Sequence, residues 1–203
     1  MHKDFILIGA SGHAKVIIEI IEAMNGRIKA ISDKNPDIAE LLGYPVHTDA
    51  PGEGQWILAI GSNNIRKRLA ENMGATYGTA IHPNANISPR CEIGEGTVVM
   101  AGVSINSSVI IGRHCIINTN ASIDHDCRID DYAHISPNAA LAGNVTVGEG
   151  AQVGIGASVI QGIHVGKWAV IGAGAAIIQD VPDYAVVAGV PGKIIKYSDT
   201  REI

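Results

Sequence analysis

The 203-residue sequence predicts a small α/β module at residues 1–80, a parallel β-helix at residues 81–180, and a C-terminal loop and tail at residues 181–203. Two observations support this prediction. Strand-like and helix-like segments alternate in the first part of the chain, which is typical of a parallel sheet covered by helices. From Ile81 onward, aliphatic side chains recur at every sixth position without an insertion.

The α/β module is predicted from segments that follow one another in a regular order. They are a buried strand in DFILIG (4–9), a tight loop in ASGHA (10–14), a helix in KVIIEIIEAM (15–24), a strand in RIKAISD (27–33), a strand in QWILAIG (55–61), and a helix in NNIRKRLAENM (63–73) with asparagines as capping candidates. Alternating strands and helices imply a small parallel sheet, half of a Rossmann-like unit.

The strand ends of this module suit a ligand that carries phosphate. The loop GASGH (9–13) presents backbone N–H groups at the positive end of a helix. Asp33 closes the second strand, where a carboxylate can accept hydrogen bonds from a ribose or a base. AIGSNN (59–64) supplies a third strand end at the same edge. Taken alone, the G-x-x-G loop is also compatible with a simple tight turn and helix cap.

The β-helix is predicted from two registers of the repeat. The first contains only Ile, Leu and Val: Ile81, Ile87, Ile93, Val99, Ile105, Ile111, Ile117, Ile123, Ile129, Ile135, Leu141, Val147, Val153, Val159, Val165, Ile171 and Ile177. Four residues after these aliphatics, small or β-branched side chains recur: Ala85, Cys91, Thr97, Val103, Val109, Cys115, Ala121, Cys127, Ala133, Ala139, Val145, Ala151 and Ala157. Glycine often follows the aliphatic, as in IGEG at 93 and VGEG at 147.

A six-residue period fits neither the 3.6-residue helix nor the two-residue alternation of an ordinary strand. It fits a triangular prism in which each hexad forms one face and three hexads form one coil. Equivalent residues then stack about 4.8 Å apart, with both registers pointing inward and glycines easing the turns. Residues 81–180 would give between five and six coils.

Composition and charge exclude several classes of function. The net charge is −5 with only 15 Lys and Arg residues, so no broad basic surface for nucleic acid is expected. No apolar run is long enough for a membrane span or a secretory signal, which predicts a soluble, cytoplasmic protein. Cys91, Cys115 and Cys127 occupy the inward register, which predicts buried, reduced thiols rather than disulfides or a zinc site.

One histidine stands out on the outward side of the repeat. His125 lies two residues after Ile123, between Asp124 and Asp126, and Gly143 stacks one coil above it. Imidazole has an ordinary pKa near 6.5, and a nearby carboxylate raises this pKa, so the side chain can act as a general base. An outward histidine is often merely structural. Its acidic neighbours on this scaffold favour catalysis.

Several motifs together resemble one family over nearly the whole chain. They are GASGH, AIGSNNIRK, the gapless hexads, NTNASIDHDC, HISPNAALAGNV, IGAGA and VVAGVPGK. The family is the bacterial UDP-4-amino-sugar N-acetyltransferases of the hexapeptide-repeat superfamily. The resemblance implies a left-handed β-helix and transfer of acetyl from acetyl-CoA to the 4-amine of a UDP-linked 4-amino-4,6-dideoxy sugar for glycan synthesis, with the C-terminal tail contributing to the CoA site and no metal.

The resemblance also implies roles for individual residues. His125 would be the base, supported by Asp126, whereas relatives often carry Glu at the second position. The acetyl-CoA groove would include His134, Gly143, Ile155 and Ala173, the last replacing a glycine of the family. The nucleotide sugar would contact Ser11, Gly12, His13, Asp33, Lys34, Gly61, Asn64 and Asn118, with Lys34 standing where relatives can carry an acid.

His134 falls half a coil beyond His125, so one prism cannot easily bring the two together. We therefore expect a homotrimer with active sites between the chains. Other functions remain open at this stage: an O-acetyltransferase acting on a sialic acid, an N-acetyltransferase acting on GDP-perosamine, a β-helix metalloenzyme using His114, His125 and His134, and a non-catalytic protein that binds nucleotide sugars.

Overall fold

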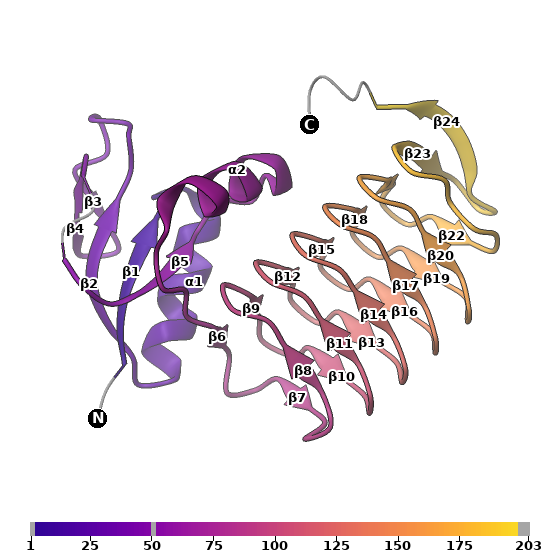
Figure 1. The fold of residues 1–203 in the computed structure, drawn as a ribbon, viewed down its shortest axis with the longest axis horizontal. Helices are drawn as coiled ribbons and strands as arrows, with labels where there is room; N and C mark the ends of the chain where they lie inside the picture. The colour runs from indigo at the N-terminus through magenta and orange to yellow at the C-terminus, as the bar shows by residue number, and fades with distance from the viewer. Residues whose placement is uncertain (1–2, 50–51, 199–203) are drawn as a thin grey trace.

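The computed structural model describes residues 3–49 and 52–198 and contains both predicted parts, which lie side by side (Figure 1). The α/β module is a five-stranded sheet in the order β3-β4-β2-β1-β5. Its elements are β1 (Asp4–Ile8), α1 (Gly12–Ala23), β2 (Arg27–Ser32), β3 (Glu40–Leu41), β4 (Tyr44–His47), β5 (Gln55–Leu58) and α2 (Asn63–Met73). The pairs β1–β2, β1–β5 and β2–β4 are parallel, so the predicted parallel sheet is confirmed.

Two details of this module differ from the sequence prediction. The short hairpin β3–β4 was not predicted, and it extends the sheet beyond β2. The expected asparagine cap of α2 is wrong, because Ser62 occupies the N-cap and its hydroxyl accepts a hydrogen bond from Ile65 N at 3.4 Å. Asn63 lies inside the helix, and its side-chain amide instead donates to Gly150 O at 3.0 Å in the β-helix.

The hexads form a left-handed parallel β-helix, as expected. Its two-residue strands are β6 (Ala80–Ile81), β7 (Asn86–Ile87), β8 (Glu92–Ile93), β9 (Val98–Val99), β10 (Ser104–Ile105), β11 (Ile110–Ile111), β12 (Ile116–Ile117), β13 (Ser122–Ile123), β14 (Arg128–Ile129), β15 (His134–Ile135), β16 (Ala140–Leu141), β17 (Thr146–Val147), β18 (Gln152–Val153), β19 (Ser158–Val159), β20 (His164–Val165), β21 (Val170–Ile171) and β22 (Ala176–Ile177).

These strands form three flat faces, each named here for its first strand. The β6 face contains β6, β9, β12, β15, β18 and β21, followed by β23 (Ala185–Ala188) and β24 (Lys193–Tyr197). The β7 face contains six strands and the β8 face five, which agrees with the prediction of between five and six coils. The chain turns from each face to the next at three corners: β6–β7, β7–β8 and β8–β6.

The inward registers form one continuous core. Val99 and the aliphatics from Ile105 to Ile177 are almost fully buried, together with the small residues beside them. Cys115 and Cys127 are buried free thiols, as predicted, but Cys91 is only partly buried. The prediction for Cys91 is wrong because it precedes β8, the first strand of its face, where no lower coil covers it.

The glycines of the repeat have two distinct functions. From Gly96 to Gly174, each turn between strands contains one residue with positive φ, such as Gly150 (+65°) or Asn144 (+59°), at the third position after an aliphatic. Glycines therefore ease several of the turns, as predicted, whereas the glycines that directly follow aliphatics have a different function. At Gly154, for example, an added Cβ would lie 2.4 Å from Ile171 O, so this glycine is needed for the close approach of neighbouring coils.

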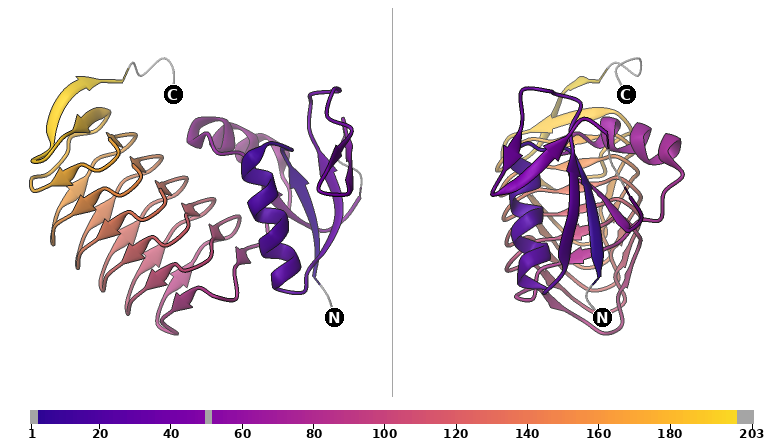
Figure 2. Two further views of the ribbon diagram at one scale, coloured as in Figure 1. Left: turned by 180° about the vertical axis from the view of Figure 1, so that it is seen from behind. Right: turned by 90° about the vertical axis from the view of Figure 1, so that its left-hand side faces the viewer.

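The two parts of the chain share a core. Helix α1 lies between the sheet and the coils (Figure 2), and its apolar face joins Val98, Met100 and Ile116, which point outward from the β6 face. Burial of these side chains fixes the α/β module against the first coils. The α/β module and the β-helix thus pack against each other through this shared core.

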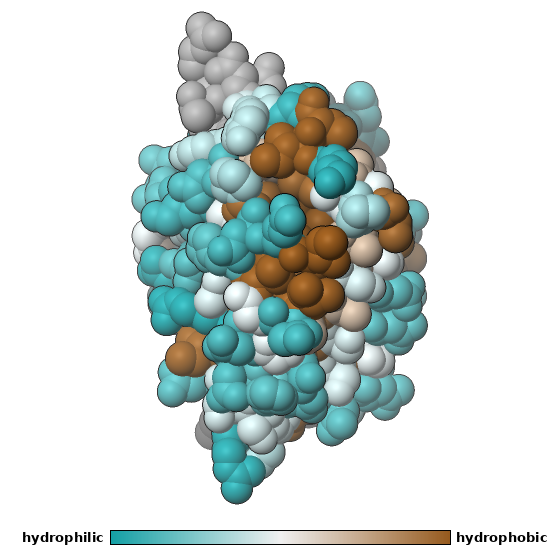
Figure 3. All heavy atoms as spheres, turned by 90° about the vertical axis from the view of Figure 1, so that its right-hand side faces the viewer, coloured by the Kyte–Doolittle hydropathy of each residue, from teal (hydrophilic) through white to brown (hydrophobic). Residues whose placement is uncertain are grey.

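The far end of the molecule is capped by the β23–β24 hairpin (Figure 1). An apolar surface covers part of this end (Figure 3), where the exposed side chains include Ile178, Val190, Ile195 and Tyr197. Of the tail predicted to contribute to the CoA site, residues 199–203 lie outside the described residues. Within the described residues, no helix is long and apolar enough to cross a membrane.

Candidate active site

His125 stands on the β7–β8 corner, directly after strand β13, with 59% of its side chain exposed. Its Nδ1 lies 2.7 Å from Oδ2 of Asp126. Asp126 has a φ of +60°, a left-handed conformation that Asp and Asn adopt more readily than most side chains. The hydrogen bond to Asp126 raises the pKa of His125, and the charge of Asp124 raises it further. Asp126, although one methylene shorter than the Glu that is common in relatives, thus makes the predicted hydrogen bond to His125.

Gly143 provides the surface on which this imidazole rests. A Cβ added to Gly143 would lie 2.7 Å from Cε1 and 2.8 Å from Nε2 of His125, so any larger residue would displace the ring. Because Nδ1 faces Asp126, Nε2 remains as the proton acceptor. Among the described residues, none accepts a hydrogen bond from the backbone N–H of Gly143.

Asp124, the other flanking carboxylate, fixes the backbone rather than the ring. Its Oδ1 accepts hydrogen bonds from His125 N at 2.8 Å and from Asn106 Nδ2 at 2.7 Å. Asn106, which sequence reasoning missed, lies 18 residues before Asp124 and so occupies the same position one coil below. The 18-residue stacking rule could have identified it. A hollow of about 350 Å³ beside His125 is lined by Asn106, Ser88 and Ser107.

His134 belongs to a second cluster, on the β6 face. Its Nε2 lies 3.0 Å from Nδ2 of Asn118, one coil below. Burial lowers the pKa of His134 to about 3, and the charges of Arg66 and His13 contribute to this shift. Burial and Arg66 likewise lower the pKa of His13 to about 4, so both imidazoles are neutral near pH 7. Within one chain, this cluster lies on a different side of the prism from His125.

The glycine loop of the α/β module is held by Asp33. Oδ2 of Asp33 accepts a hydrogen bond from Ala10 N at 2.8 Å, and Oδ1 accepts one from Asn35 N at 2.9 Å. The expectation of free loop N–H groups is therefore wrong for Ala10. By contrast, Gly12 and Gly61 are exposed, and a Cβ added to either would meet nothing within 4 Å. Neither glycine is needed for local packing, which leaves room for a ligand.

A hollow of about 590 Å³ opens beside Asp33 and Lys34. Its apolar wall includes Ile65, Leu69 and Met73, which recur at four-residue spacing along one side of α2. Sequence reasoning did not assign these residues to the ligand site, although their helical spacing was visible. Of the other residues expected here, Lys34 lines the hollow and pairs with the exposed Asp49 at 3.3 Å. Ser11 is the N-cap of α1 and Asn64 lies in the first turn of α2, and neither lines the hollow.

Ile155 and Ala173 lie one coil apart on the β6–β7 corner, and both are exposed. The β7 face separates this corner from the corner that carries His125 and Gly143. A hollow of about 470 Å³ lies on this face. The outward side chains that line it include the small residues Ser104, Ser122, Ala140 and Ser158. A flexible, extended ligand could lie flat across this face between the two corners.

The proposed metal arrangement is not formed. Among residues 3–49 and 52–198, no group of three or more His, Cys, Asp or Glu side chains could hold a metal ion. His114, one of the three histidines considered for a metalloenzyme, stacks on Tyr132 and contacts the edge of Tyr77. Burial raises the pKa of the Cys115 thiol to about 12, which excludes it as a nucleophile near neutral pH.

Comparison with known proteins places this arrangement in a family. The model of the PglD N-terminal domain matches residues 4–73. UDP-N-acetylbacillosamine N-acetyltransferase of Bacillus subtilis (strain 168) is 42% identical over 113 residues, which cover 49% of this chain and 52% of that protein. The match thus spans about half the length of this relative.

Two solved structures match over almost the whole chain. A histidine-to-asparagine variant of perosamine N-acetyltransferase from Caulobacter crescentus, in complex with CoA and GDP-perosamine, is 41% identical with a TM-score of 0.90 and covers 95% of this chain and 97% of that one. The acetyltransferase domain of PglB from Neisseria gonorrhoeae, in complex with acetyl coenzyme A, is 36% identical with a TM-score of 0.88 and covers 96% and 100%. This chain therefore belongs to the bacterial 4-amino-sugar N-acetyltransferases of the hexapeptide-repeat superfamily.

Proposed function

We propose that this protein transfers an acetyl group from acetyl-CoA to the 4-amine of a UDP-linked 4-amino-4,6-dideoxy sugar of the N-acetylbacillosamine type, a reaction of bacterial glycan synthesis. The observation that carries the proposal is the exposed His125–Asp126 pair, with Nδ1 and Oδ2 2.7 Å apart, seated on Gly143. The relatives that bind CoA, acetyl-CoA or GDP-perosamine support the substrate class.

In the proposed reaction, His125 Nε2 removes a proton from the sugar amine as the nitrogen attacks the thioester carbon. A C–N bond forms and the C–S bond breaks, and the proton passes from the imidazole to the leaving sulfur to give free CoA. Asp126 holds the imidazole through Nδ1 and raises its pKa, which makes it a stronger base. The N–H of Gly143 would stabilise the negative charge that develops on the thioester oxygen.

We assign the nucleotide sugar to the α/β module and acetyl-CoA to the coils. Ser11, Gly12, His13, Asp33 and Gly61 would bind the nucleotide, together with Lys34 in the hollow beside Asp33 and Asn64 in the first turn of α2. Asn118 and His134 would face the sugar and the acetyl group. The arm of CoA would cross the small side chains of the β7 face, from Ile155 and Ala173 to Gly143. No metal is required by this mechanism.

These assignments require more than one chain. His125 lies on the β7–β8 corner, whereas Asn118 and His134 lie on the β6 face of the same prism. Three prisms side by side can bring the His125 corner of one chain to the His134 face of the next, with three equivalent sites. We therefore propose a homotrimer in which each active site combines two chains.

A second candidate substrate is GDP-perosamine. It is favoured by the Caulobacter crescentus structure, which was solved with GDP-perosamine and matches 95% of this chain, whereas the Bacillus subtilis match covers 49%. Both candidates present an amine to the same general base, His125. They differ mainly in the nucleobase and the sugar that the α/β module must bind.

Release of free CoA thiol tests the function directly. Purified protein and acetyl-CoA would be mixed separately with the UDP-linked 4-amino sugar, with GDP-perosamine and with a free sialic acid. We expect the highest kcat/KM with the UDP-linked sugar. Higher turnover with GDP-perosamine would favour the second candidate, and turnover with sialic acid alone would contradict N-acetylation.

A further inference from the structure

Arg66 is buried where the α/β module meets the coils, with only 1% of its surface exposed. Within the module, its guanidinium donates to Ile60 O at 2.9 Å, to Gly61 O at 3.3 Å and to Asn63 Oδ1 at 2.9 Å. From the coils, it donates to His114 O and Tyr132 O, both at 2.7 Å. All five acceptors are neutral oxygens.

A buried cation without a carboxylate partner is costly, because carbonyl dipoles replace its hydration only in part. The planar guanidinium offers five N–H donors in a fixed fork, so it can join several carbonyl groups that a lysine ammonium could not reach together. Hydrophobic side chains of similar size would hold the two parts together at a lower cost. Arg66 therefore requires an explanation beyond stability.

The carbonyls that Arg66 binds lie next to residues already assigned to the site. Gly61 directly follows Ile60, which lines the hollow beside Asp33. Tyr132 precedes His134 by two residues on the same turn. One guanidinium thus connects the loop proposed to bind the nucleotide with the segment that presents His134.

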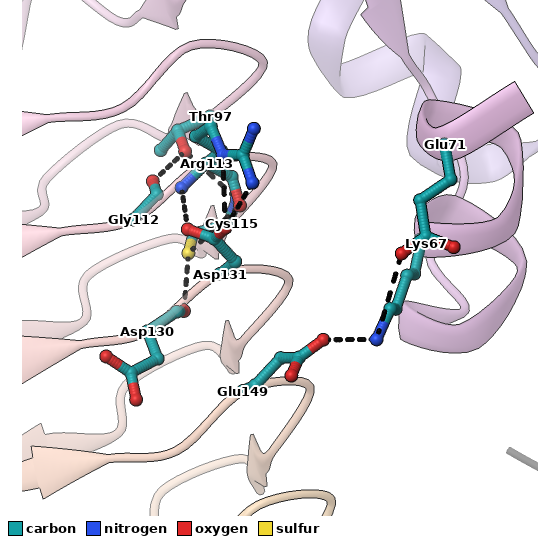
Figure 4. Close-up of polar contacts among 9 residues, drawn as sticks. All are labelled: Lys67, Glu71, Thr97, Gly112, Arg113, Cys115, Asp130, Asp131 and Glu149. Carbon is teal, nitrogen blue, oxygen red and sulfur yellow. Dashed lines mark hydrogen bonds and ion pairs between the residues drawn. The ribbon is translucent and has the colours of Figure 1, made fainter. Parts of the chain in front are cut away.

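Helix α2 continues this connection along the β8–β6 corner. His114 and Tyr132 occupy this corner on successive coils, and Gly150 occupies it on the third coil, where its carbonyl accepts from Asn63. One turn further along α2, Lys67 pairs with Glu149 and with Glu71 (Figure 4). The helix is therefore fixed against three consecutive coils, with Arg66 at the centre.

We propose that Arg66 is a positioning residue for acetyl transfer, which sets the separation between the nucleotide-binding loop at Gly61 and the acetyl-binding segment at His134. This inference rests on the proposed function. The charge of Arg66 adds a second effect, since it lowers the pKa of both His13 and His134 and helps to keep these imidazoles neutral. A neutral imidazole can accept a hydrogen bond from a bound substrate through one ring nitrogen and donate a hydrogen bond to the substrate through the other.

The test compares Arg66→Lys and Arg66→Met with Arg68→Met, which removes the same charge from an exposed position of the same helix. For each variant, thermal unfolding, KM and kcat for both substrates, and the affinity for UDP by calorimetry would be measured. For Arg66→Lys we expect folded protein with KM for the nucleotide sugar raised by about tenfold or more and weaker UDP binding. For Arg68→Met, the KM for the nucleotide sugar and the affinity for UDP should both remain within about twofold of the wild-type values.

An NMR titration of the imidazoles separates positioning from a purely structural role. Arg66→Met should raise the pKa of His13 and His134, since its cation is lost, whereas Arg68→Met should not. If the Arg66 variants lower only the unfolding temperature and leave KM, UDP affinity and the imidazole pKa values unchanged, Arg66 is structural and the inference fails. A wild-type protein that releases no CoA with any amino sugar would instead contradict the proposed function, while UDP binding and NMR would still test Arg66.

Discussion

At the scale of single residues, the position of His125 between two aspartates has a physical explanation. The two carboxylates act on different parts of the histidine. Asp126 contacts the ring at Nδ1, and Asp124 accepts the backbone N–H of His125 while it also binds Asn106. The ring is thereby oriented on an otherwise exposed corner, with Nε2 free for substrate.

Replacement of His125 by Asn tests its role as the base. We expect His125→Asn to lower kcat by about 10²- to 10⁴-fold with unchanged folding, because general-base catalysis contributes on that order. His164→Asn is a matched control, since His164 is an exposed histidine in strand β20 of the β8 face, outside the residues assigned to the site. Thiol release under saturating substrates measures both. Full turnover by His125→Asn would require another base.

Replacement of Asp126 tests the origin of the basicity. Asn adopts the left-handed backbone at this position as readily as Asp, so Asp126→Asn removes the charge without straining the corner. The pKa of His125 is raised by Asp126, and activity requires the neutral imidazole, so activity is lost as the pH falls through this pKa. We expect the acidic limb of kcat/KM to move to lower pH in Asp126→Asn, with a lower plateau. If the acidic limb of the kcat/KM profile stayed at the same pH, Asp126 would not raise the pKa of His125.

The residues of the site differ in how well the sequence predicts them. His125 and Gly143 could be predicted to stack because an 18-residue separation spans one coil. The contact of Asp33 with Ala10 and the burial of Arg66 could not be predicted, because they depend on how a loop and a polar helix pack. In RKR at 66–68, nothing in the sequence distinguishes the buried Arg66 from the exposed Arg68.

At the scale of elements, the short strands are stable only because their aliphatics stack on one another. Each strand contains two residues and would not persist alone. The hexad pattern therefore predicts the strands well, because the same inward position is buried on every coil. The β3–β4 hairpin is harder to predict, since its turn places Leu42 at a φ of +49° where Asn or Gly would be the usual signal.

The stacking explanation predicts unequal costs for two isoleucines of the coils. Ile135 is fully buried, whereas Ile110 is 41% exposed. Ile135→Ala should lower the free energy of unfolding by about 2–5 kcal/mol through lost burial and a residual cavity. Ile110→Ala should cost less than about 1 kcal/mol. Denaturant titration followed by circular dichroism measures both, and equal costs would contradict the assigned registers.

At the scale of the whole molecule, the prism separates the groups that we assign to the proposed reaction. The His125 corner and the His134 face point in different directions. The hollow beside Asp33, which we propose binds the nucleotide, is attached to the His134 side through α1 and α2. Under the proposed assignments, a single chain therefore presents half of one site and half of another. In the homotrimer proposed above, association of three chains would complete each site, which would make assembly a condition for activity.

The most direct measurement of this central claim is activity in mixed assemblies. His125→Ala and His134→Ala chains, each shown to be nearly inactive alone, would be unfolded together in equal amounts, refolded and assayed. If each site combines His125 of one chain with His134 of the next, about one quarter of the sites in randomly mixed trimers carry both histidines, and activity should return to about that fraction of the wild type. Mixed trimers that form, as seen by mass spectrometry, but recover no activity would show that both histidines act within one chain.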